Sequence, residues 1–228
     1  MKTALITGAS RGLGFAVADA LAGLGWKLII TARNADELLE AARRLQARTE
    51  VRAVEGDIAS PRHRQALLAG VERLDLLVNN ASQLGLGPDS RLADYPASDL
   101  RRLFETNFFA PLALIQLALP ALRNAGGRVI SISSDAALGA YAGWGVYGSS
   151  KAALDQLSNV LGAEEPALRI YAVDPGEMQT AMLRQAYPND DLADRADPAD
   201  VAYALLELVT GDLPSGRYKA AKLQGVRS

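Results

Sequence analysis

The stretch Thr3–Gly14, TALITGASRGLG, joins a short apolar run to a glycine-rich turn and then to a segment of helical period. TALIT has the length and composition of a buried strand. Gly8, Gly12 and Gly14 allow a tight turn that brings backbone N–H groups against a phosphate, next to the positive end of a helix. The stretch therefore predicts a phosphate-binding turn, although a glycine-rich turn without a ligand has the same pattern.

Five more apolar runs resemble TALIT, and each is separated from the next by a segment long enough for a crossover helix. They are KLIIT (27–31), VRAV (51–54), DLLVNN (75–80), RVISIS (128–133) and LRIYAV (168–173). Helix starts are marked by a capping box at Asn34 with Glu37, and by Ser60-Pro61 and Asp197-Pro198. The pattern predicts an α/β fold of the Rossmann type: a doubly wound, mainly parallel sheet of about seven strands, with helices on both faces, in three layers.

The composition predicts one domain over residues 1–228. At 228 residues and 49% hydrophobic content the chain can bury a full core, and no repeat or long linker divides it. The net charge of -2 and the scattered arginines argue against a nucleic-acid partner. With no cysteine, no signal sequence and no uninterrupted apolar run of membrane-spanning length, we expect a cytoplasmic protein without disulfides or a membrane partner. No metal site is predicted.

The stretch Ser134–Lys151 contains the groups of a proton-transfer site. Tyr147 and Lys151 are four residues apart, so they share one face if the segment is helical. A free tyrosine has a pKa near ~10 and needs a neighbouring cation to act near neutral pH. Tyr147 can then protonate a carbonyl oxygen while Ser134 hydrogen-bonds the same oxygen. In a chain with seven tyrosines, the Tyr-x-x-x-Lys spacing alone also arises by chance.

The end of the second apolar run bears on the choice of dinucleotide. In a dinucleotide fold this position contacts the adenosine ribose, and here it holds Ala32 and Arg33 rather than a carboxylate. Together with Arg11, Arg33 can bind a 2′-phosphate, which favours NADP over NAD, unless both arginines are merely solvated. Asp57, after the third run, either accepts a hydrogen bond from adenine or forms a turn.

The glycine turn also matches a motif of hydrolases, but the rest of the sequence argues against a hydrolase. Gly8-Ala9-Ser10-Arg11-Gly12 satisfies the G-x-S-x-G pattern of a nucleophile elbow. Such an enzyme needs a histidine base after the serine and the acid in the chain order. The only histidine, His63, lies too early, in the polar first turn of an expected helix. We expect His63 to be a solvated helix residue.

Asparagines end the fourth apolar run and interrupt a long helical segment. Asn79 and Asn80 can satisfy backbone groups where the strand stops. Asn107 lies in an apolar part of the helical run 98–123 and must be hydrogen-bonded if buried. Pro111 removes the helical donor for the Asn107 carbonyl, so we expect a kink there and a bound water.

Together these motifs resemble those of one family, the short-chain dehydrogenases/reductases, over essentially the whole chain. Each stands in that family's order and spacing: Thr7-Gly8-x-x-x-Gly12-x-Gly14, Asp57, Asn79-Asn80-Ala81, Asn107, Ser134, Tyr147-x-x-x-Lys151 and Pro175-Gly176 with Thr180. One departure is Ser82, where the family usually has glycine. Another feature is Asp135, next to Ser134, which lies either at the substrate mouth or in a solvated turn.

The resemblance implies a catalytic tetrad of Asn107, Ser134, Tyr147 and Lys151. Tyr147 would be the general acid or base, Ser134 would orient the carbonyl, and Lys151 would bind the nicotinamide ribose and depress the pKa of Tyr147. Asn107 would hold a water that links Lys151 to solvent. The residues expected to bind NADP(H), with the Met178 backbone and Thr180 at the carboxamide, are Gly8, Ser10, Arg11, Gly12, Leu13, Gly14, Arg33, Asp57, Ile58, Asn80, Ala81, Tyr147, Lys151, Pro175, Gly176, Met178 and Thr180.

The expected function is an NADPH-dependent reductase of aldehydes or ketones, reversible as an alcohol dehydrogenase, with a small-molecule substrate. The alternative is a catalytically silent NADP(H)-binding sensor or scaffold, against which the intact tetrad argues. A short substrate loop is expected at about 177–196, with candidate pocket walls at Leu84, Leu138, Tyr141, Trp144, Met178 and Met182. The family uses the helices at 98–123 and 147–161 for subunit contacts, and Ala152, Ala153, Leu157, Val160 and Leu161 fit a homodimer or homotetramer.

Overall fold

The computed structural model describes residues 1–88 and 90–223, and all of its named strands belong to one parallel sheet. The strand order is β3-β2-β1-β4-β5-β6-β7, and every neighbouring pair is parallel. The strands are Thr3–Thr7 (β1), Lys27–Ala32 (β2), Val51–Glu55 (β3), Leu76–Asn79 (β4), Arg128–Ile132 (β5), Arg169–Asp174 (β6) and Gly216–Lys219 (β7). The predicted doubly wound α/β fold is confirmed.

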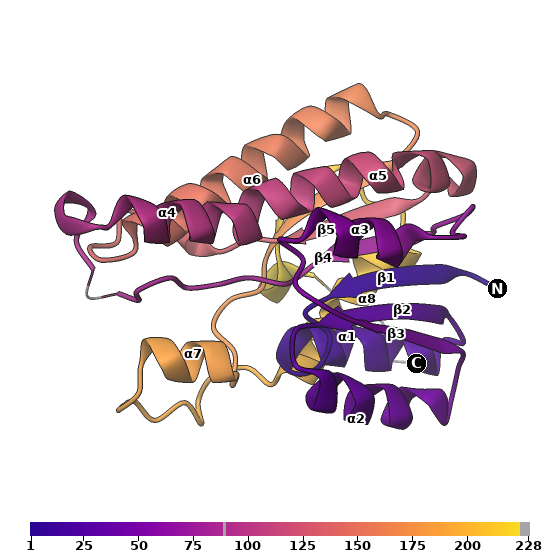
Figure 1. The fold of residues 1–228 in the computed structure, drawn as a ribbon, viewed down its shortest axis with the longest axis horizontal. Helices are drawn as coiled ribbons and strands as arrows, with labels where there is room; N and C mark the ends of the chain where they lie inside the picture. Colours follow the sequence, from indigo (N-terminus) through magenta and orange to yellow (C-terminus); the bar gives the residue numbers. More distant parts are fainter. Residues whose placement is uncertain (89, 224–228) are drawn as a thin grey trace.

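Helices cover both faces of the sheet. They are Gly12–Gly23 (α1), Ala35–Gln46 (α2), Pro61–Leu68 (α3), Ala97–Phe104 (α4), Ala110–Ala125 (α5), Gly145–Glu164 (α6), Ala181–Ala186 (α7) and Pro198–Thr210 (α8). Figure 1 shows α1, α2 and α8 on one face and α3, α4, α5 and α6 on the other. The resulting three layers match the prediction.

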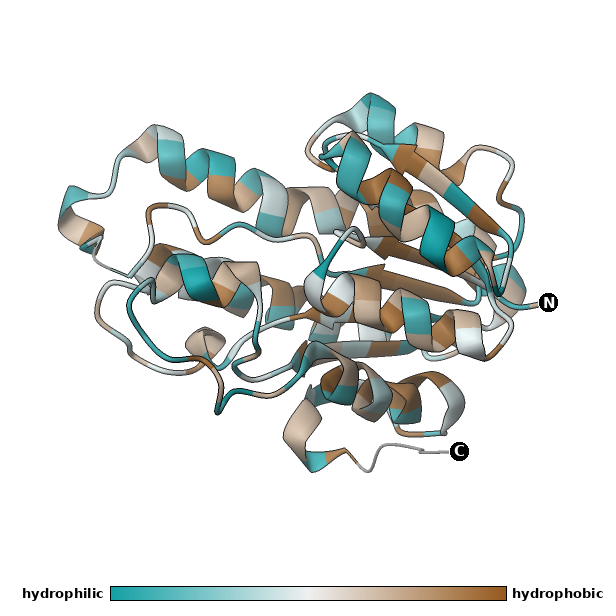
Figure 2. Ribbon diagram, turned by 90° about the horizontal axis from the view of Figure 1, so that it is seen from below, coloured by the Kyte–Doolittle hydropathy of each residue, from teal (hydrophilic) through white to brown (hydrophobic). Residues whose placement is uncertain are grey.

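Two apolar cores lie on either side of the sheet because successive strand residues point to opposite faces. In β1, Ala4 and Ile6 pack with α1, α2 and α8, whereas Leu5 packs with α3 and α5. Both faces are therefore apolar, which explains why the strands read as continuous hydrophobic runs rather than alternating ones. Figure 2 shows the hydrophobic colour gathered in the strands and on the inner faces of the helices.

The expected helix starts are all present. The side chains of Asn34, Ser60 and Asp197 cap α2, α3 and α8 by accepting hydrogen bonds from backbone N–H groups in the first helical turn. Each satisfies a donor that has no partner within the helix. The capping positions could be identified from sequence because the cap and the donor are only two or three residues apart.

The long helical run 98–123 is interrupted as expected. Glu105–Phe109 forms a π-helical turn (η2) between α4 and α5, and Asn107 lies within it. Pro111 has no N–H to donate to the carbonyl of Asn107, so the regular ladder of hydrogen bonds breaks at this point. The π-helical turn directs Asn107 inward, where its side chain is 1% exposed.

The continuous helical run Ala97–Ala125 is, by length and composition, apolar enough to cross a membrane, and no other run in the described ranges meets this test. The run is not an uninterrupted apolar stretch, because Arg101, Arg102 and Glu105 lie within it. Leu114, Ile115 and Leu122 of α5 are buried in the core against the sheet. A helix that covers a sheet needs an apolar stripe of this kind, so the packing accounts for the composition.

The expectation for His63 is wrong. Its side chain is buried, and Nε2 lies 2.8 Å from Oγ1 of Thr31 in β2. Burial lowers the pKa of His63, although the charges of Asp57 and Glu55 oppose the shift. The ring fits inward because Gly56 has no side chain, and a Cβ there would lie 2.3 Å from Nδ1 of His63. His63 is therefore a neutral core residue that links α3 to the sheet.

Candidate active site

The glycine turn lies where the strand order reverses, between β1 and β4. Gly8 and Gly12 adopt positive φ angles of 66° and 57°, which residues with a side chain rarely do. At Gly14 a Cβ would lie 2.3 Å from the carbonyl oxygen of Gly8, so only glycine fits under the turn. The first turn of α1 has no side-chain cap, and its N–H groups stay available for an anion.

Asn80 links the glycine turn to the end of β4 through hydrogen bonds. Its Nδ2 donates to the carbonyl oxygens of Thr7 at 2.9 Å and of Gly8 at 3.1 Å. The backbone N–H groups of Asn80 and Ala81 both donate to Oγ1 of Thr7 at 3.0 Å. Asn80 thus satisfies backbone groups where the strands stop, as expected, and sets the distance between the turn and the loop after β4.

Arg11 and Arg33 both line the cavity next to the glycine turn, but Arg11 already has a partner. Its guanidinium lies 3.0 Å from Oε1 of Glu37, and Ser10 Oγ donates to Oε2 of the same carboxylate at 3.2 Å. From the sequence, Glu37 is predicted only as a capping residue of α2. In the structure its backbone N–H binds the Asn34 cap, which leaves its carboxylate to reach the glycine turn.

Asp57 lines the same end of the cavity and also forms a turn. Its Oδ1 accepts a hydrogen bond from the N–H of Ala59 at 2.9 Å, and Ile58 lies beside it on the wall. Both readings left open for Asp57 are therefore compatible with the structure, because its second carboxylate oxygen remains available.

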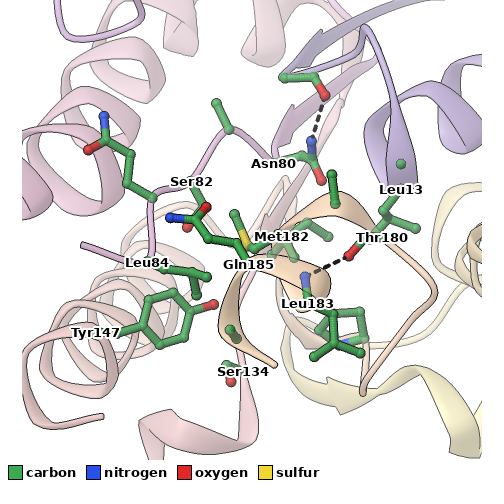
Figure 3. Close-up of a pocket in the computed structure, with 18 of the residues that line it drawn as sticks. Leu13, Asn80, Ser82, Leu84, Ser134, Tyr147, Thr180, Met182, Leu183 and Gln185 are labelled. Atoms are coloured by element: carbon green, nitrogen blue, oxygen red, sulfur yellow. Dashed lines mark hydrogen bonds between the residues drawn. The ribbon is translucent and has the colours of Figure 1, made fainter. Parts of the chain in front are cut away.

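Ser134, Tyr147 and Lys151 come together at the ends of β5 and α6. Tyr147 and Lys151 share one face of α6, and Lys151 Nζ lies 5.5 Å from the centre of the Tyr147 ring. Lys151 is 2% exposed and donates to the carbonyl oxygen of Ile132 at 2.8 Å. Figure 3 shows the Tyr147 hydroxyl and Ser134 facing one space, with Leu84 beside them.

Burial dominates the protonation of both α6 side chains. It raises the pKa of Tyr147 to about 12, against the hydrogen bonds of Ser134 and Ser82, which lower it. It lowers the pKa of Lys151 to about 8, against the nearby charge of Asp155. The expected depression of the Tyr147 pKa is therefore not what the structure has, because desolvation of the phenolate outweighs the favourable interactions.

Asn107 ties the loop after β4 to α6. Its Oδ1 accepts from the N–H of Gln83 at 2.9 Å and from Ser82 Oγ at 3.2 Å. Its Nδ2 donates to the carbonyl oxygen of Gln83 at 2.9 Å and to Ser150 Oγ at 3.1 Å. The side chain has all its partners within the protein, so a water at this residue would bind its main-chain carbonyl.

Ser82, which stands where the family usually has glycine, connects two of the candidate catalytic residues. Its hydroxyl donates to Oδ1 of Asn107 at 3.2 Å, and its interaction with the Tyr147 phenol lowers the pKa of that phenol against the larger effect of burial. A glycine would leave both groups without this partner. The departure therefore adds a polar contact to the site rather than only changing the loop.

A buried ion pair that no pattern in the sequence indicates lies beneath Ser134. Arg217 of β7 donates from Nε to Oδ2 of Asp155 at 2.8 Å and from an Nη to the carbonyl oxygen of Ser134 at 2.8 Å. Asp155 follows Lys151 by one turn of α6 and is 6% exposed. The pair joins the edge strand to the backbone of Ser134 and to the surroundings of Lys151.

One cavity of about 1240 Å³ contains nearly all of the predicted site. Gly14 and Asn107 are not on its wall and support it from behind. The predicted residues that line it are Gly8, Ser10, Arg11, Gly12, Leu13, Arg33, Asp57, Ile58, Asn80, Ala81, Ser134, Tyr147, Lys151, Pro175, Gly176, Met178 and Thr180. The cavity thus runs from the glycine turn to Ser134 and Tyr147.

The far end of the cavity, beyond Tyr147, is formed by loops and by α7. Five of the expected apolar walls are present, namely Leu84, Tyr141, Trp144, Met178 and Met182. The expectation for Leu138 is wrong, because its side chain is 72% exposed and does not line the cavity. Tyr187 and Gln185, in and after α7, line it instead. Figure 3 shows Met182, Leu183 and Gln185 of α7 on the side opposite Tyr147.

The chain matches the family model for short chain dehydrogenase over residues 2–191. It is 35% identical to a rhamnolipids biosynthesis 3-oxoacyl-[acyl-carrier-protein] reductase of Pseudomonas aeruginosa, over 88% of this chain and 81% of the relative. A tropinone reductase homolog of Arabidopsis thaliana is also 35% identical, over 83% and 73%.

A solved short chain dehydrogenase from Shigella flexneri, complexed with NADP, superposes with a TM-score of 0.88 at 27% identity. The superposition covers 96% of this chain and 97% of the other. The match to the family model extends from β1 through the glycine turn, Ser134, Tyr147 and Lys151 to α7. On these grounds the chain belongs to the short-chain dehydrogenase/reductase family and is an oxidoreductase.

Proposed function

We propose that this protein reduces an aldehyde or ketone to an alcohol with NADPH, or catalyses the reverse reaction, on one domain spanning residues 1–228. The observation that carries the proposal is the convergence of Ser134, Tyr147 and Lys151 on the cavity that begins at the glycine turn. Two relatives support the reaction class, since one is named as a 3-oxoacyl reductase and the other as a homolog of tropinone reductase.

The residues present fit a dinucleotide. The uncapped first turn of α1 and the glycine turn, where a Cβ at Gly14 would clash, leave backbone N–H groups open to a pyrophosphate. Lys151, Pro175, Gly176 and Met178 line the next part of the cavity, where they would hold the nicotinamide ribose and ring. Bound NADPH supplies the hydride that reduces the carbonyl carbon.

Side chains of this protein would bind the carbonyl oxygen of the substrate and donate a proton to it. The Ser134 hydroxyl, which donates to the Asp135 carboxylate in the free protein, would turn to the carbonyl oxygen of a bound substrate, and Ser134 and Tyr147 together would hold that oxygen beside the phenol. With a pKa of about 12, the Tyr147 phenol is protonated at neutral pH and is the correct form to donate a proton to that oxygen. The ammonium of Lys151 stabilises the phenolate that forms, and solvent returns the proton to Tyr147.

The experiment that tests this proposal measures NADPH and NADH oxidation across a panel of aldehydes, ketones, quinones and acyl-thioester ketones. We expect the protein to reduce at least one of these classes of carbonyl compound, and to do so faster with NADPH than with NADH. Binding of NADPH without turnover of any class would favour the sensor alternative.

Glu37 provides a test of the NADP preference. A 2′-phosphate has to share Arg11 with the Glu37 carboxylate, because Glu37 lies at hydrogen-bonding distance from Arg11 and Ser10. We expect Glu37→Gln to raise the ratio of kcat/KM for NADPH over NADH by roughly three- to tenfold. The control is Glu40→Gln, which removes an exposed carboxylate of α2 that pairs with Arg43. An unchanged or lower ratio would mean that the phosphate does not bind at Arg11.

We also propose a homo-oligomer built on the outer faces of α5 and α6. Of the apolar residues expected there, Leu157 and Leu161 pack on the core of their own subunit. Phe109, Leu117 and Val160 remain 50%, 44% and 43% exposed on neighbouring parts of this layer. Figure 1 shows α5 and α6 side by side as its outermost helices.

A charge in this face should separate the subunits. We expect Leu117→Glu to weaken association by about 100-fold or more, since a carboxylate buried without a partner is costly. Sedimentation equilibrium or light scattering should then show a monomer. Leu24→Glu, at an exposed leucine that ends α1 on the other side of the sheet, is the control and should leave the mass unchanged. A monomeric wild-type protein would refute the proposed interface.

A further inference from the structure

The two ends of the cavity differ in the charge that a ligand would meet. Arg11 and Arg33 line the end next to the glycine turn, and Lys151 is buried in the middle. Apart from Glu37 and Asp57 near the glycine turn, the other charged residues on the wall are the carboxylates Asp135, Asp174 and Glu177. Within residues 1–88 and 90–223, no lysine or arginine lines the far end of the cavity, beyond Tyr147.

Two of these three carboxylates lie next to arginines. Glu177 lies 2.6 Å from Arg195. Asp174 is buried and accepts a hydrogen bond from the N–H of Gly176, and Arg217 lies 3.9 Å from its second oxygen. Because Arg195 also pairs with Asp194 and Arg217 also pairs with Asp155, the negative charges of Glu177 and Asp174 are only partly offset.

Asp135 is the exception. It is exposed, and its carboxylate accepts hydrogen bonds from the hydroxyls of Ser134 at 3.1 Å and Tyr141 at 3.0 Å. No arginine or lysine of the described residues lies within ion-pair distance of it. Burial is the main cause of the raised pKa values of Tyr147 and Tyr187, and the charge of Asp135 adds to both, so it acts across the mouth of the cavity. Asp135 is thus an unneutralised anion next to the reacting phenol.

Aromatic rings surround the same space. The Trp144 ring lies 5.6 Å from that of Tyr147 and 6.1 Å from that of Tyr187, between centroids. Tyr141 adds a fourth ring, held by its hydrogen bond to Asp135. The faces of such rings carry partial negative charge and attract ammonium groups, tryptophan most strongly. A carboxylate and several aromatic rings together favour a cation over an anion.

We propose that the carbonyl substrate of this site carries a positively charged amine, which lies between Asp135 and the rings of Trp144 and Tyr187 while its carbonyl meets Tyr147. This inference rests on the proposed carbonyl reduction and names its substrate class. A carbonyl compound bearing a carboxylate or phosphate at the same distance is disfavoured, because it meets Asp135 with no cation to receive it. A purely structural role for Asp135, in holding the Tyr141 hydroxyl, would be met equally well by asparagine.

The test uses three ketones of nearly the same shape: para-(aminomethyl)acetophenone, para-ethylacetophenone and para-acetylbenzoate. At neutral pH and low ionic strength, we expect kcat/KM to fall from the cation through the neutral ketone to the anion. The cation should exceed the anion by roughly ten- to a hundredfold, and added salt should reduce that ratio. Equal values for cation and anion, or a preference for the anion, would overturn the proposal.

Asp135→Asn provides the decisive comparison. We expect the cation-to-anion ratio, measured within the variant, to fall to about one-tenth or less of the wild-type ratio. Glu164→Gln, which removes an exposed carboxylate near the far end of α6, controls for net charge and should leave the ratio unchanged. A ratio that persists in Asp135→Asn would show that Asp135 only supports the loop.

A binding measurement separates this inference from the proposed function. Benzyltrimethylammonium and benzoate are titrated into the protein saturated with NADP⁺, and their dissociation constants are compared in wild type and Asp135→Asn. If none of the ketones reacts but the ammonium binds more tightly in wild type alone, carbonyl reduction of this class is wrong and the cation site stands. If the ketones react and neither ligand shows a charge preference, the reduction stands and the cation site is wrong.

Discussion

Replacing Tyr147 with phenylalanine is expected to lower kcat for carbonyl reduction by roughly 100- to 10,000-fold, the usual contribution of a positioned general acid. The phenol is the group that the structure places beside Ser134 and keeps protonated, with a pKa of about 12. Phenylalanine keeps the ring and its edge contact with Trp144 but has no proton to donate. The dissociation constant of NADPH should change by no more than about threefold, because only one hydroxyl contact is lost.

Steady-state kinetics and a fluorescence titration with NADPH measure the two quantities separately. Tyr203→Phe is the matched control, since it removes the hydroxyl of a tyrosine that is 44% exposed on α8, away from the cavity. Turnover that survives in Tyr147→Phe would assign the proton to another group. A loss of NADPH binding in that variant would instead indicate that Tyr147 acts by holding the cofactor.

The second large effect is expected in stability, at Arg217. Arg217→Met leaves the Asp155 carboxylate buried without its guanidinium and removes a donor from the carbonyl of Ser134. Breaking a buried pair by deleting one partner costs about 3–5 kcal/mol, and we expect the lower end because Arg217 is 18% exposed. Urea denaturation should show this loss with an unchanged slope.

Two further variants show whether the loss of stability in Arg217→Met comes from the buried charge. Arg43→Met removes an exposed ion pair with Glu40 and should cost less than about 0.5 kcal/mol. Combining Arg217→Met with Asp155→Leu removes both charges and should recover most of the stability, as buried pairs replaced by apolar residues often do. If Arg217→Met alone is as stable as wild type, then Asp155 is not charged or not shielded from water in the folded protein.

The sequence predicts the fold well because its signals are local. Six strands are apolar runs, and the caps at Asn34, Ser60 and Asp197 lie within three residues of the donors they satisfy. The seventh strand, Gly216–Lys219, could not be located from the sequence, because GRYK is four residues long and half of it is charged. Its place at the edge of the sheet tolerates this composition.

The sequence predicts the site residues that are related by their spacing along the chain. It does not predict the contacts between site residues that meet only in the folded protein. Tyr147 and Lys151 are found because four residues make one helical turn. The contacts Arg217–Asp155 and Glu37–Arg11 join residues 62 and 26 positions apart, and nothing near either residue in the sequence indicates its partner. His63 is misassigned for a similar reason, since the space for its ring is provided by Gly56 and its partner is Thr31 on another strand.

Transfer of a hydride from NADPH to the carbonyl carbon can be followed with an isotope. The protein is incubated with a reactive ketone and NADPH deuterated on the transferred face of its nicotinamide, and the alcohol is analysed by mass spectrometry and NMR. We expect one deuterium per molecule on the carbinol carbon, formed at a rate that falls by roughly 100-fold or more in Tyr147→Phe and is unchanged in Tyr203→Phe. An alcohol without deuterium, or labelling at the same rate in Tyr147→Phe, would contradict the proposed mechanism.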